Sequence, residues 1–332
     1  MLKAAIIGMG VGEAHISGYE KNPDVKVVSL CDFDTKRLDE IKEKYPDKKL
    51  TENANKVLYD PEINIISVAS YDNFHSDHII KALNNGKHVF VEKPLCLFTH
   101  EAKSIRVALR RNPSLKMSSN LILRRCPRFI EIKKRIDEGI MGEIYHLDGA
   151  YNYGRTNKIT NGWRGKIDFF SGICGGGVHL LDLFLWFSRK KVFEVSAYGN
   201  QISTSGSAFK YNDCISAVIK LEDGITGVLS VRLASIMPHF HQLDIWGTKA
   251  TFVNYPEHGI FYSSQHPNDT PEIINLAYPG ACKGDLLNNF IRSITSNIPL
   301  EVGTEDIFKV MSVCFAIDNS LKEGKPQRVK YI

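Results

Sequence analysis

The sequence predicts two domains: an α/β domain built on a parallel sheet, then an α+β domain with a large, mostly antiparallel open sheet. Up to about residue 120, short apolar runs alternate with helical segments, which is typical of a parallel sheet covered on both faces. The first run leads directly into a glycine-rich segment at the start of a helix. After about residue 127, β-rich runs follow one another without helices between them. We therefore expect domains 1–120 and 121–332.

The strands of the first domain are predicted from apolar runs bounded by turn residues. They are expected at residues 3–8, 25–32, 64–70, 88–93 and 115–120. Helix signals lie between these runs. Asp34 and Thr35 can cap a helix that has Leu38 and Ile41 on one face, and Gly86 ends another helix.

The second domain begins with a helix predicted from Pro127 to Gly139. The β-runs expected after it are 143–153, 192–201, 214–221, 226–233, 241–248 and 250–255. The segment Glu222-Asp223-Gly224 predicts a hairpin turn. A helix at about 304–323 and a terminal strand at 327–332 complete the domain.

Composition and charge exclude several classes of protein. The 332 residues are 43% hydrophobic and 24% charged, and the net charge of +5 includes no dense basic block, which argues against nucleic acid as a partner. Seven scattered cysteines without a C-x-x-C pair predict reduced thiols in a cytoplasmic protein. No apolar run approaches the ~18 residues of a membrane span. The histidines form no metal-binding pattern, and the H-x-H at 239–241 lies in a predicted strand, so we expect no metal.

The glycine-rich segment suits a dinucleotide. A tight turn with bare backbone lets a pyrophosphate rest against the helix N-terminus, where amide N–H groups and the helix dipole favour anions. We expect cofactor contacts from Gly8, Gly10, Val11 and Gly12. The G-x-G-x-G spacing is one residue shorter than the usual fingerprint, and a plain strand-to-helix turn is the alternative.

Asp32 ends the second run, where a carboxylate can accept hydrogen bonds from the ribose hydroxyls of adenosine. It favours NAD(H) and opposes the additional phosphate of NADP(H). Helix capping is the alternative, but Asp34 and Thr35 already fill that role.

Polar side chains follow the third and fourth runs, at the carboxyl edge where ligands bind to open parallel sheets. The cofactor candidates at this edge are Ser70, Tyr71, Asn73, His75, Glu92 and Lys93. For His75 and the neighbouring His78, a role at a helix start or a plain surface position is the alternative.

The succession IIGMGVGEAH, LCDFD, SVASYDNFHSDHIIKALNNGKHVFVEKPL and GGGVHLLDLFLW resembles the glucose-fructose oxidoreductase, inositol dehydrogenase and rhizopine-catabolism (Gfo/Idh/MocA) family along nearly the whole chain. The E-K-P motif is its most specific mark. The resemblance implies an N-terminal nicotinamide-cofactor Rossmann domain and a C-terminal domain whose open sheet often mediates dimers or tetramers. It also implies redox chemistry on sugars, cyclitols, nucleotide sugars or related compounds.

Lys93 is the first candidate for catalysis. With NAD across the strand ends, Lys93 would point at the oxygen of the reacting carbon, because the following Pro94 holds the backbone extended and aims the side chain. In the family the Lys-Pro bond is frequently cis. A solvated ion pair of Glu92 and Lys93 is the alternative.

His179 and Asp182 are the other catalytic candidates. They share a helix face, and an imidazole exchanges a proton near neutral pH. The resemblance places a G-x-H-x-x-D pattern at Gly177, His179 and Asp182, with the histidine beside the substrate. Many relatives carry an aspartate where this chain has Gly175, so the identity of the base stays open. A helix-start histidine bonded to backbone is the alternative.

Aromatic and cationic residues suggest how a sugar with an anionic group would bind. The substrate candidates are Lys93, Asn120, Arg124, Tyr151, Tyr153, Arg155, Trp163 and His179. The resemblance places the pair Trp163-Arg164 near cofactor or substrate. For each arginine, a surface ion pair is an equal alternative.

These residues together predict an NAD(H)-dependent dehydrogenase that acts on a hydroxyl of a sugar, cyclitol or nucleotide sugar by hydride transfer. One alternative is an enzyme that keeps NAD tightly bound and uses transient oxidation for non-redox sugar chemistry. Another is an NAD-binding sensor or scaffold that has lost catalysis. The six β-runs of the second domain leave one sheet face uncovered by helices, and the apolar alternation at 228–233 offers a surface for pairing, which predicts a homodimer or homotetramer.

Overall fold

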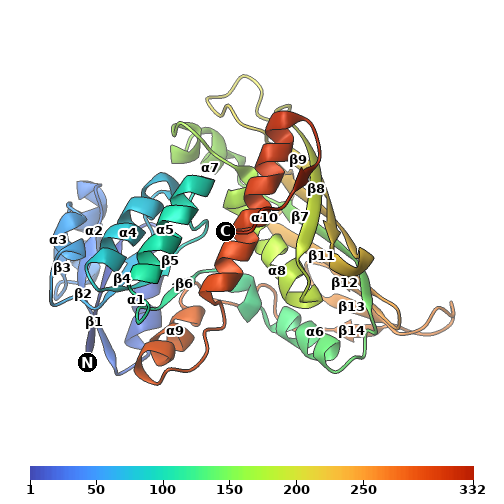
Figure 1. Ribbon diagram of the computed structural model, residues 1–332, viewed down its shortest axis with the longest axis horizontal. Coiled ribbons are helices and arrows are strands. Elements are labelled where there is room, and N and C mark those ends of the chain that lie inside the picture. The colour runs from blue at the N-terminus through green and yellow to red at the C-terminus, as the bar shows by residue number, and fades with distance from the viewer. The chain divides into compact units, whose positions relative to one another are not determined.

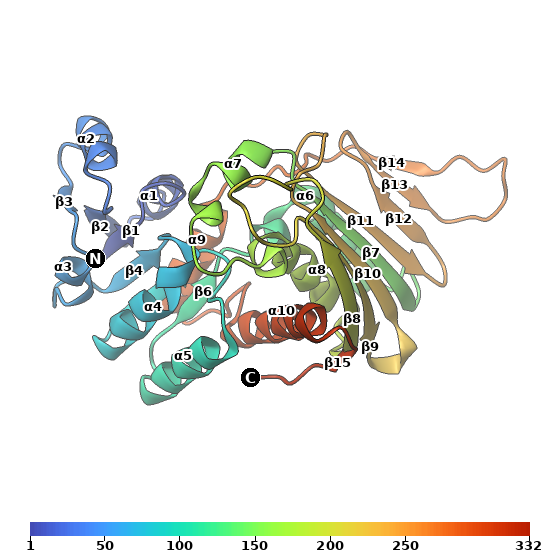
Figure 2. The ribbon, with the colours of Figure 1, turned by 90° about the horizontal axis from the view of Figure 1, so that it is seen from above.

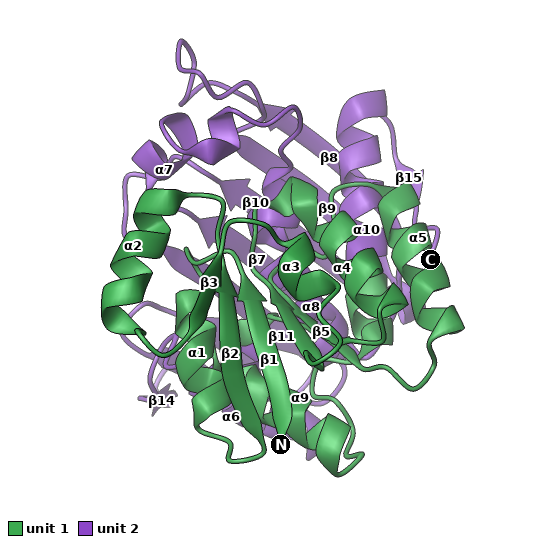
Figure 3. Ribbon diagram, turned by 90° about the vertical axis from the view of Figure 1, so that its left-hand side faces the viewer, with its two compact units in different colours: residues 1–122, 282–308, 332 green, residues 123–281, 309–331 purple.

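The computed structural model describes residues 1–332, which divide into two compact units (Figure 3). Unit 1 comprises residues 1–122, 282–308 and 332, and unit 2 comprises 123–281 and 309–331. The first boundary lies near residue 120, but the chain returns to unit 1 for residues 282–308, which we had expected in the second domain. No helix combines the length and apolar character needed to cross a bilayer.

Unit 1 contains a six-stranded parallel sheet in the order β3-β2-β1-β4-β5-β6. Its strands are β1 (Leu2–Ile7), β2 (Val25–Cys31), β3 (Lys49–Thr51), β4 (Ile65–Val68), β5 (His88–Val91) and β6 (Met117–Ser119). The five predicted runs are confirmed, and the short edge strand β3 was not predicted. Because the strand order reverses between β1 and β4, the carboxyl ends of these strands flank the point where open α/β sheets bind ligands.

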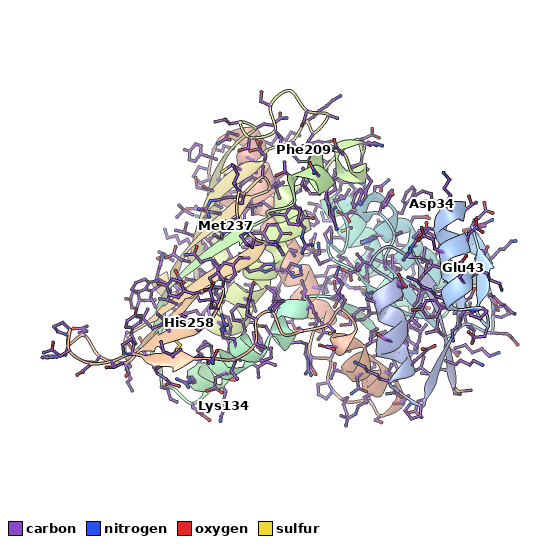
Figure 4. The ribbon with its side chains drawn as sticks, turned by 180° about the vertical axis from the view of Figure 1, so that it is seen from behind. Asp34, Glu43, Lys134, Phe209, Met237 and His258 are labelled. Atoms are coloured by element: carbon purple, nitrogen blue, oxygen red, sulfur yellow. The ribbon has the colours of Figure 1, made fainter.

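The helices of unit 1 follow from local signals. They are α1 (Glu13–Glu20), α2 (Thr35–Lys44), α3 (Asn55–Leu58), α4 (His75–Asn84), α5 (Thr99–Arg111) and α9 (Asp285–Thr295), with a 3₁₀ turn η1 (Asp72–Phe74). Asp34 caps α2 by accepting from the Lys36 amide at 3.0 Å, and Figure 4 labels Asp34 at the start of this helix and Glu43 near its end. Gly86, at a φ of +71°, follows α4 as predicted.

Close packing of two glycines explains why α9 belongs to unit 1. A Cβ at Gly18 in α1 would lie 2.8 Å from the Cα of Gly284, directly before α9. Leu286, Leu287 and Phe290 of α9 are buried. The helix therefore contributes its apolar face to the core of the first unit, far along the chain from the other helices.

Unit 2 is built on a nine-stranded sheet in the order β14-β13-β12-β11-β7-β10-β9-β8-β15. Its strands are β7 (Ile144–Asn152), β8 (Val192–Asn200), β9 (Cys214–Leu221), β10 (Thr226–Arg232), β11 (Phe240–Gly247), β12 (Thr251–Asn254), β13 (Gly259–Tyr262), β14 (Glu272–Ile274) and β15 (Gln327–Arg328). Only β7 and β10 pair in parallel. Asp223 and Gly224, both at positive φ, form the predicted hairpin between β9 and β10.

The helices of unit 2 cover one face of this sheet. They are α6 (Pro127–Asp137), α7 (Thr156–Thr160), α8 (Val178–Ser188) and the 309–323 part of α10 (Thr304–Glu323), with short helical turns η2 (Ile122–Arg125), η3 (Trp163–Gly165), η4 (Ile173–Gly177) and η5 (Glu222–Gly224). Figures 1 and 2 show α8 and α10 on the same side of the strands. On the opposite face the side chains of Tyr198 and Val218 are 75% and 59% exposed, so this face carries solvent-exposed apolar groups as predicted.

Candidate active site

The glycine turn after β1 fits a pyrophosphate. Gly8 has a φ of +94°, and a Cβ on it would collide with the carbonyl oxygen of Ala69, so only glycine suits this position. A Cβ on Gly12 would collide with the carbonyl oxygen of Gly8. A Cβ on Gly10, by contrast, would meet nothing within 4 Å. The turn therefore presents bare backbone to open space beside Val11, and the first turn of α1 has no side-chain cap.

Asp32 is positioned by two backbone amides at the end of β2. Its Oδ2 accepts from the Met9 amide at 2.6 Å and its Oδ1 from the Asp34 amide at 3.0 Å. A carboxylate oxygen can accept more than one hydrogen bond, so both oxygens of Asp32 remain able to accept hydrogen bonds from ribose hydroxyls. The carboxylate thus stands beside the glycine turn in the position that the sequence predicted for ribose binding.

An exposed aromatic residue next to Asp32 was missed by the sequence interpretation. Phe33 is 61% exposed, and its ring lies edge-to-face against Tyr71 with centroids 5.3 Å apart. Burial raises the pKa of Tyr71, and Asp32 and Asp34 raise it further. Two aromatic rings beside the Asp32 carboxylate suit the adenine of a dinucleotide. An exposed phenylalanine directly after a buried strand was the available signal.

The histidine at the start of α4 has a structural position. His75 is fully buried, with Nδ1 at 2.7 Å from the carbonyl oxygen of Pro94 and Nε2 at 3.0 Å from that of Ser70. Because it has no exposed surface, the expected direct contact with a cofactor is corrected to a role in joining two strand ends. Ser70 also bonds His78 through its hydroxyl at 3.1 Å, and Asn73 is exposed on η1. Burial lowers the pKa of His78 to about 4.

Glu92 is part of a buried network and not of a solvated ion pair. Its Oε1 lies 3.1 Å from Nε2 of His15 and accepts from Nδ2 of Asn120 at 2.7 Å. Burial acts to raise the pKa of Glu92, but His15, Lys283 and Asn120 outweigh it and lower this pKa to about 2. The carboxylate is therefore charged at neutral pH and fixed directly before Lys93.

This network changes the expected roles of two residues. Glu92 was predicted to contact the cofactor, and Asn120 the substrate. Asn120 is only 2% exposed, and its amide also donates to the Lys283 carbonyl at 3.0 Å. Glu92 and Asn120 are therefore buried side chains that stabilise the end of β5, while Lys93 itself is half-buried. The Lys93–Pro94 peptide bond is cis.

In unit 2, Arg124 and Asp182 hold each other. Arg124 donates from Nε to Oδ2 at 2.9 Å and from Nη2 to Oδ1 at 2.6 Å, and both side chains are buried. The Arg124 guanidinium also lies over the Trp186 ring, 5.7 Å from its centroid. The expected substrate contact of Arg124 and the expected catalytic role of Asp182 are therefore replaced by a structural ion pair.

Two of the three glycines before α8 make room for aromatic rings. Residues 173–177 form a π-helical turn, a rare form that is frequent at functional sites. A Cβ on Gly175 would lie 2.9 Å from the Phe170 ring, and one on Gly176 would collide with the ring of Tyr151. The rings therefore pack directly on the backbone that leads into His179.

His179 lies in a cluster of histidines and tyrosines. Its ring centroid is 5.6 Å from that of His241, which is 4.8 Å from that of His239. Tyr151 and Tyr153 stack with centroids 5.7 Å apart, and Tyr151 is 5.2 Å from each of the other two histidines. The sequence interpretation had considered residues 239–241 only as a metal site and missed this cluster. Finding it requires the register that pairs His241 with Tyr151.

Cationic residues lie around this cluster. Arg155 lies 5.9 Å from the centroid of the Tyr153 ring, and Arg164 lies 4.6 Å from that of Trp163 in η3. Burial raises the pKa of Tyr151, and Arg164 and Arg155 partly oppose this. Unit 2 thus gathers the predicted residues around His179, while unit 1 gathers those of the glycine turn, Asp32 and Lys93.

Comparisons with known proteins agree with this geometry. The family model described as oxidoreductase family, NAD-binding Rossmann fold (GFO_IDH_MocA) matches residues 2–118, and the GFO/IDH/MocA C-terminal domain matches 129–253. The chain is 26% identical over 252 residues to D-glucoside 3-dehydrogenase of Escherichia coli, covering 71% of this chain and 68% of the relative. It is 22% identical over 355 residues to myo-inositol 2-dehydrogenase of Thermotoga maritima, covering 100% and 99%.

A solved structure has the same fold. Levoglucosan dehydrogenase in complex with NADH matches with a TM-score of 0.88 and 19% identity over 100% of both chains. The glycine turn and Asp32 fit the cofactor that the matched family model names, so NAD is the cofactor of unit 1. Because the two matched ranges together cover more than half of the sequence, the chain belongs to the GFO/IDH/MocA family of NAD-binding oxidoreductases.

Proposed function

We propose that this protein is a dehydrogenase that oxidises one hydroxyl of a sugar, cyclitol or nucleotide sugar with NAD. The observation that carries the proposal is Lys93, a half-buried lysine at the carboxyl end of β5, in the same unit as a glycine turn that fits a dinucleotide. The names of the relatives, a glucoside dehydrogenase and an inositol dehydrogenase, support polyhydroxylated substrates.

Lys93 and His179 divide the chemistry at the hydroxyl. NAD, when bound by the glycine turn and Asp32, supplies the acceptor for the hydride that leaves the carbinol carbon. The Lys93 ammonium binds the hydroxyl oxygen and stabilises the negative charge that develops on it. His179 accepts the hydroxyl proton on a ring nitrogen. Asp182 takes no proton in this proposal, because Arg124 holds both of its oxygens.

The aromatic and cationic residues of unit 2 would bind the rest of the substrate. The stacked rings of Tyr151 and Tyr153 provide an apolar face of the kind on which sugar C–H groups pack. Arg155 lies beside the Tyr153 ring, and Arg164 acts electrostatically on Tyr151; both cations favour an anionic substituent such as a carboxylate or a diphosphate. We therefore place sugar acids and UDP-sugars in the first group of substrates to be tested.

A substrate panel tests the proposal. Sugars, sugar acids, cyclitols and UDP-sugars are each mixed with NAD and enzyme, and nicotinamide absorbance is followed. We expect stoichiometric NADH release with at least one compound and a stronger response to NAD than to NADP. The Lys93→Met variant, prepared in parallel, is the control for contaminating dehydrogenases. Conversion of a sugar without net NADH release would contradict the proposal and favour transient oxidation by bound NAD.

A further inference from the structure

His241 lies between His179, the proton acceptor of the proposed mechanism, and Tyr278, which that mechanism does not use. Its side chain contacts that of His179, with ring centroids 5.6 Å apart and planes at 89°. On the other side, Nδ1 of His241 lies 2.8 Å from the hydroxyl oxygen of Tyr278. Both histidines are buried, so neither ring is free to turn without displacing its neighbours.

The Tyr278 hydroxyl determines which nitrogen of His241 carries the hydrogen. Its oxygen already accepts the backbone amide of His241 at 2.8 Å. Burial raises the pKa of Tyr278, so this hydroxyl keeps its proton. That proton is available to Nδ1, which then acts as acceptor, and the ring hydrogen of the neutral imidazole lies on Nε2.

A buried arginine fixes Tyr278 and the carbonyl of His241. Arg128, in the first turn of α6, is fully buried, and its guanidinium lies 5.4 Å from the centroid of the Tyr278 ring. It donates from Nη1 to Oδ1 of Asn254 at 2.7 Å and from Nη2 to the carbonyl of Leu276 at 3.0 Å. Asn254 in turn donates to the His241 carbonyl at 3.1 Å.

Arg128 is a buried cation whose hydrogen bonds connect separate segments of unit 2. Burial lowers the pKa of Arg128, while its guanidinium donates five hydrogen bonds within the protein. Its hydrogen-bond acceptors are backbone carbonyls and one amide oxygen, without a carboxylate among them. Arg128 thus connects the segment that carries Tyr278, through the carbonyl of Leu276, to Asn254.

Neutral and cationic groups pack around His241. They are Tyr151 and His239 from the sheet, His179 from α8, Tyr278, and behind Tyr278 the residues Arg128 and Cys126. Arg155 and Arg164 act on Tyr151. A proton on His241 would therefore lie among positive groups and would oppose a second proton on His179.

We propose that His241 is the positioning residue of His179, and that the Tyr278 hydroxyl keeps the His241 ring neutral and fixed. The inference rests on the proposed role of His179 as proton acceptor. A hydrogen bond donated to Nδ1 exists only while that nitrogen is unprotonated, so it favours the neutral ring. A neutral, fixed His241 leaves His179 able to receive the substrate proton.

Histidine titration by NMR tests the positioning pair without any substrate. The Cε1–H signals of His179 and His241 are assigned with the His179→Asn and His241→Asn variants. In Tyr278→Phe the lost hydrogen bond should raise the pKa of His241 by about one pH unit, and the charge this ring then acquires should lower that of His179. Unchanged titration of both rings would overturn the inference.

Kinetics then test whether the pair acts in the reaction. In Tyr278→Phe, a proton on either ring now blocks proton acceptance, so the acidic limb of the oxidation rate should move to higher pH. The single-turnover rate at its optimum should fall about tenfold in His241→Asn, without movement of the limb to higher pH, because position 241 no longer carries a ring that can be protonated. Adding Tyr278→Phe to His241→Asn should change this rate less than twofold, since Tyr278 acts through His241.

Tyr331→Phe is the matched control. Tyr331 accepts the Val192 amide at 2.7 Å and donates to the Val192 carbonyl at 3.0 Å, so its loss removes a comparable hydroxyl from the same unit. We expect lower thermal stability but wild-type titrations and pH profile. An equal effect of Tyr278→Phe with and without His241 would reject the inference. If no substrate reduces NAD, the proposed function fails while the NMR titrations still decide whether the two rings are coupled.

Discussion

Lys93 is held in place by residues on both sides of it in the chain. Before it, the buried Glu92 carboxylate is bound by His15 and Asn120. After it, the carbonyl of Pro94 lies within hydrogen-bonding distance of the buried His75. The backbone of the lysine is thereby fixed while its side chain stays half-buried, as is required of a cation that binds a substrate oxygen without a large ordering cost.

Replacement of Lys93 by methionine should separate catalysis from cofactor binding. The side chain keeps its approximate length but loses the charge, so hydride transfer should slow by ~10²-fold or more, the scale of one positioned electrostatic group. NAD affinity should stay within about twofold, because the glycine turn and Asp32 are intact. Single-turnover kinetics and calorimetry measure the two effects. Lys103→Met, on the exposed side of α5, is the control, and a Lys93→Met rate near that of wild type would reject the assignment.

Asp32 should make the protein prefer NAD to NADP. Its carboxylate is fixed by the Met9 and Asp34 amides, so it cannot move away from a 2′-phosphate without breaking these bonds. We expect at least about tenfold tighter binding of NAD, which corresponds to ~1.4 kcal/mol. Asp32→Asn should narrow this difference, and the exposed Asp39→Asn should not. Equal calorimetric affinities in the wild type would contradict the expectation.

At the scale of elements, the sequence was most informative where chain order alone determines position. The carboxyl ends of parallel strands lie at one edge of the sheet, so the positions of Asp32 and Lys93 at that edge could be predicted from strand order. The return of α9 to unit 1 depends on contact between Gly18 and Gly284, which no local pattern reveals. The same holds for His241, whose neighbours depend on strand register and on a loop.

Irregular backbone was a second source of error. The glycines at 175–177 indicated close approach, but they did not indicate the π-helical turn that they form or the aromatic rings that approach Gly175 and Gly176. Asn120 and Arg124 were polar residues near a domain boundary, and only the structure shows that their partners are Glu92 and Asp182. Residue type and chain order alone do not distinguish a polar side chain that binds a ligand from one that binds another side chain.

Two glycines of the first turn should respond differently to alanine. At Gly10 the added methyl meets no protein atom, so the thermal stability of the NAD-free protein should stay within about 1 °C, since no packing or cavity term changes. The methyl occupies the space needed by the pyrophosphate, and NAD affinity should fall at least about tenfold. At Gly12 the methyl collides with the Gly8 carbonyl, so Gly12→Ala should also lower the melting temperature. Unchanged NAD binding in Gly10→Ala would contradict this account.

Asp318 should give unit 2 a pH-dependent stability. The carboxyl accepts from the Ser171 hydroxyl at 2.9 Å and from the Cys174 thiol at 3.6 Å, but burial dominates and raises its pKa from 3.8 to about 6. The folded state therefore binds a proton that the unfolded chain releases, and stability is lost as pH rises from 3.8 through about 6. Each pH unit in that window lowers the free energy of unfolding by about 1.4 kcal/mol, and the partial exposure of the Asp318 side chain reduces this amount.

Melting curves of Asp318→Asn at pH 5 and pH 8 measure this effect. The variant lacks the charge, so relative to wild type it should be more stable at pH 8 than at pH 5. Asp269→Asn, on an exposed loop, should show no such change. A difference between wild type and Asp318→Asn that is the same at both pH values would show that the carboxyl titrates normally.

At the scale of the whole molecule, the uncovered face of the nine-stranded sheet offers a surface for association with another chain. Strand β9 alternates buried and exposed residues along its length, so its outward side chains form a continuous row with those of β8 and β10. Val218 lies directly opposite Val228 in β10 and Ser196 in β8. An apolar patch in the middle of an open sheet face is a typical surface for association between identical chains.

We predict that this face joins two or four copies of the chain, and that Val218→Asp separates them. A carboxylate at the centre of the patch would have to be buried twice in a two-fold interface, once from each copy, and this desolvation is costly even with Lys220 on the same face of β9. Light scattering at micromolar concentration should give a multiple of 37.4 kDa for the wild type and a value near 37.4 kDa for the variant. Because Val218 is 59% exposed in the single chain, Val218→Asp should keep its circular dichroism spectrum. Val107→Asp, at a 45% exposed position on α5, should remain associated like the wild type. A wild-type mass of one chain would reject the predicted assembly, and an associated Val218→Asp variant would place the interface elsewhere.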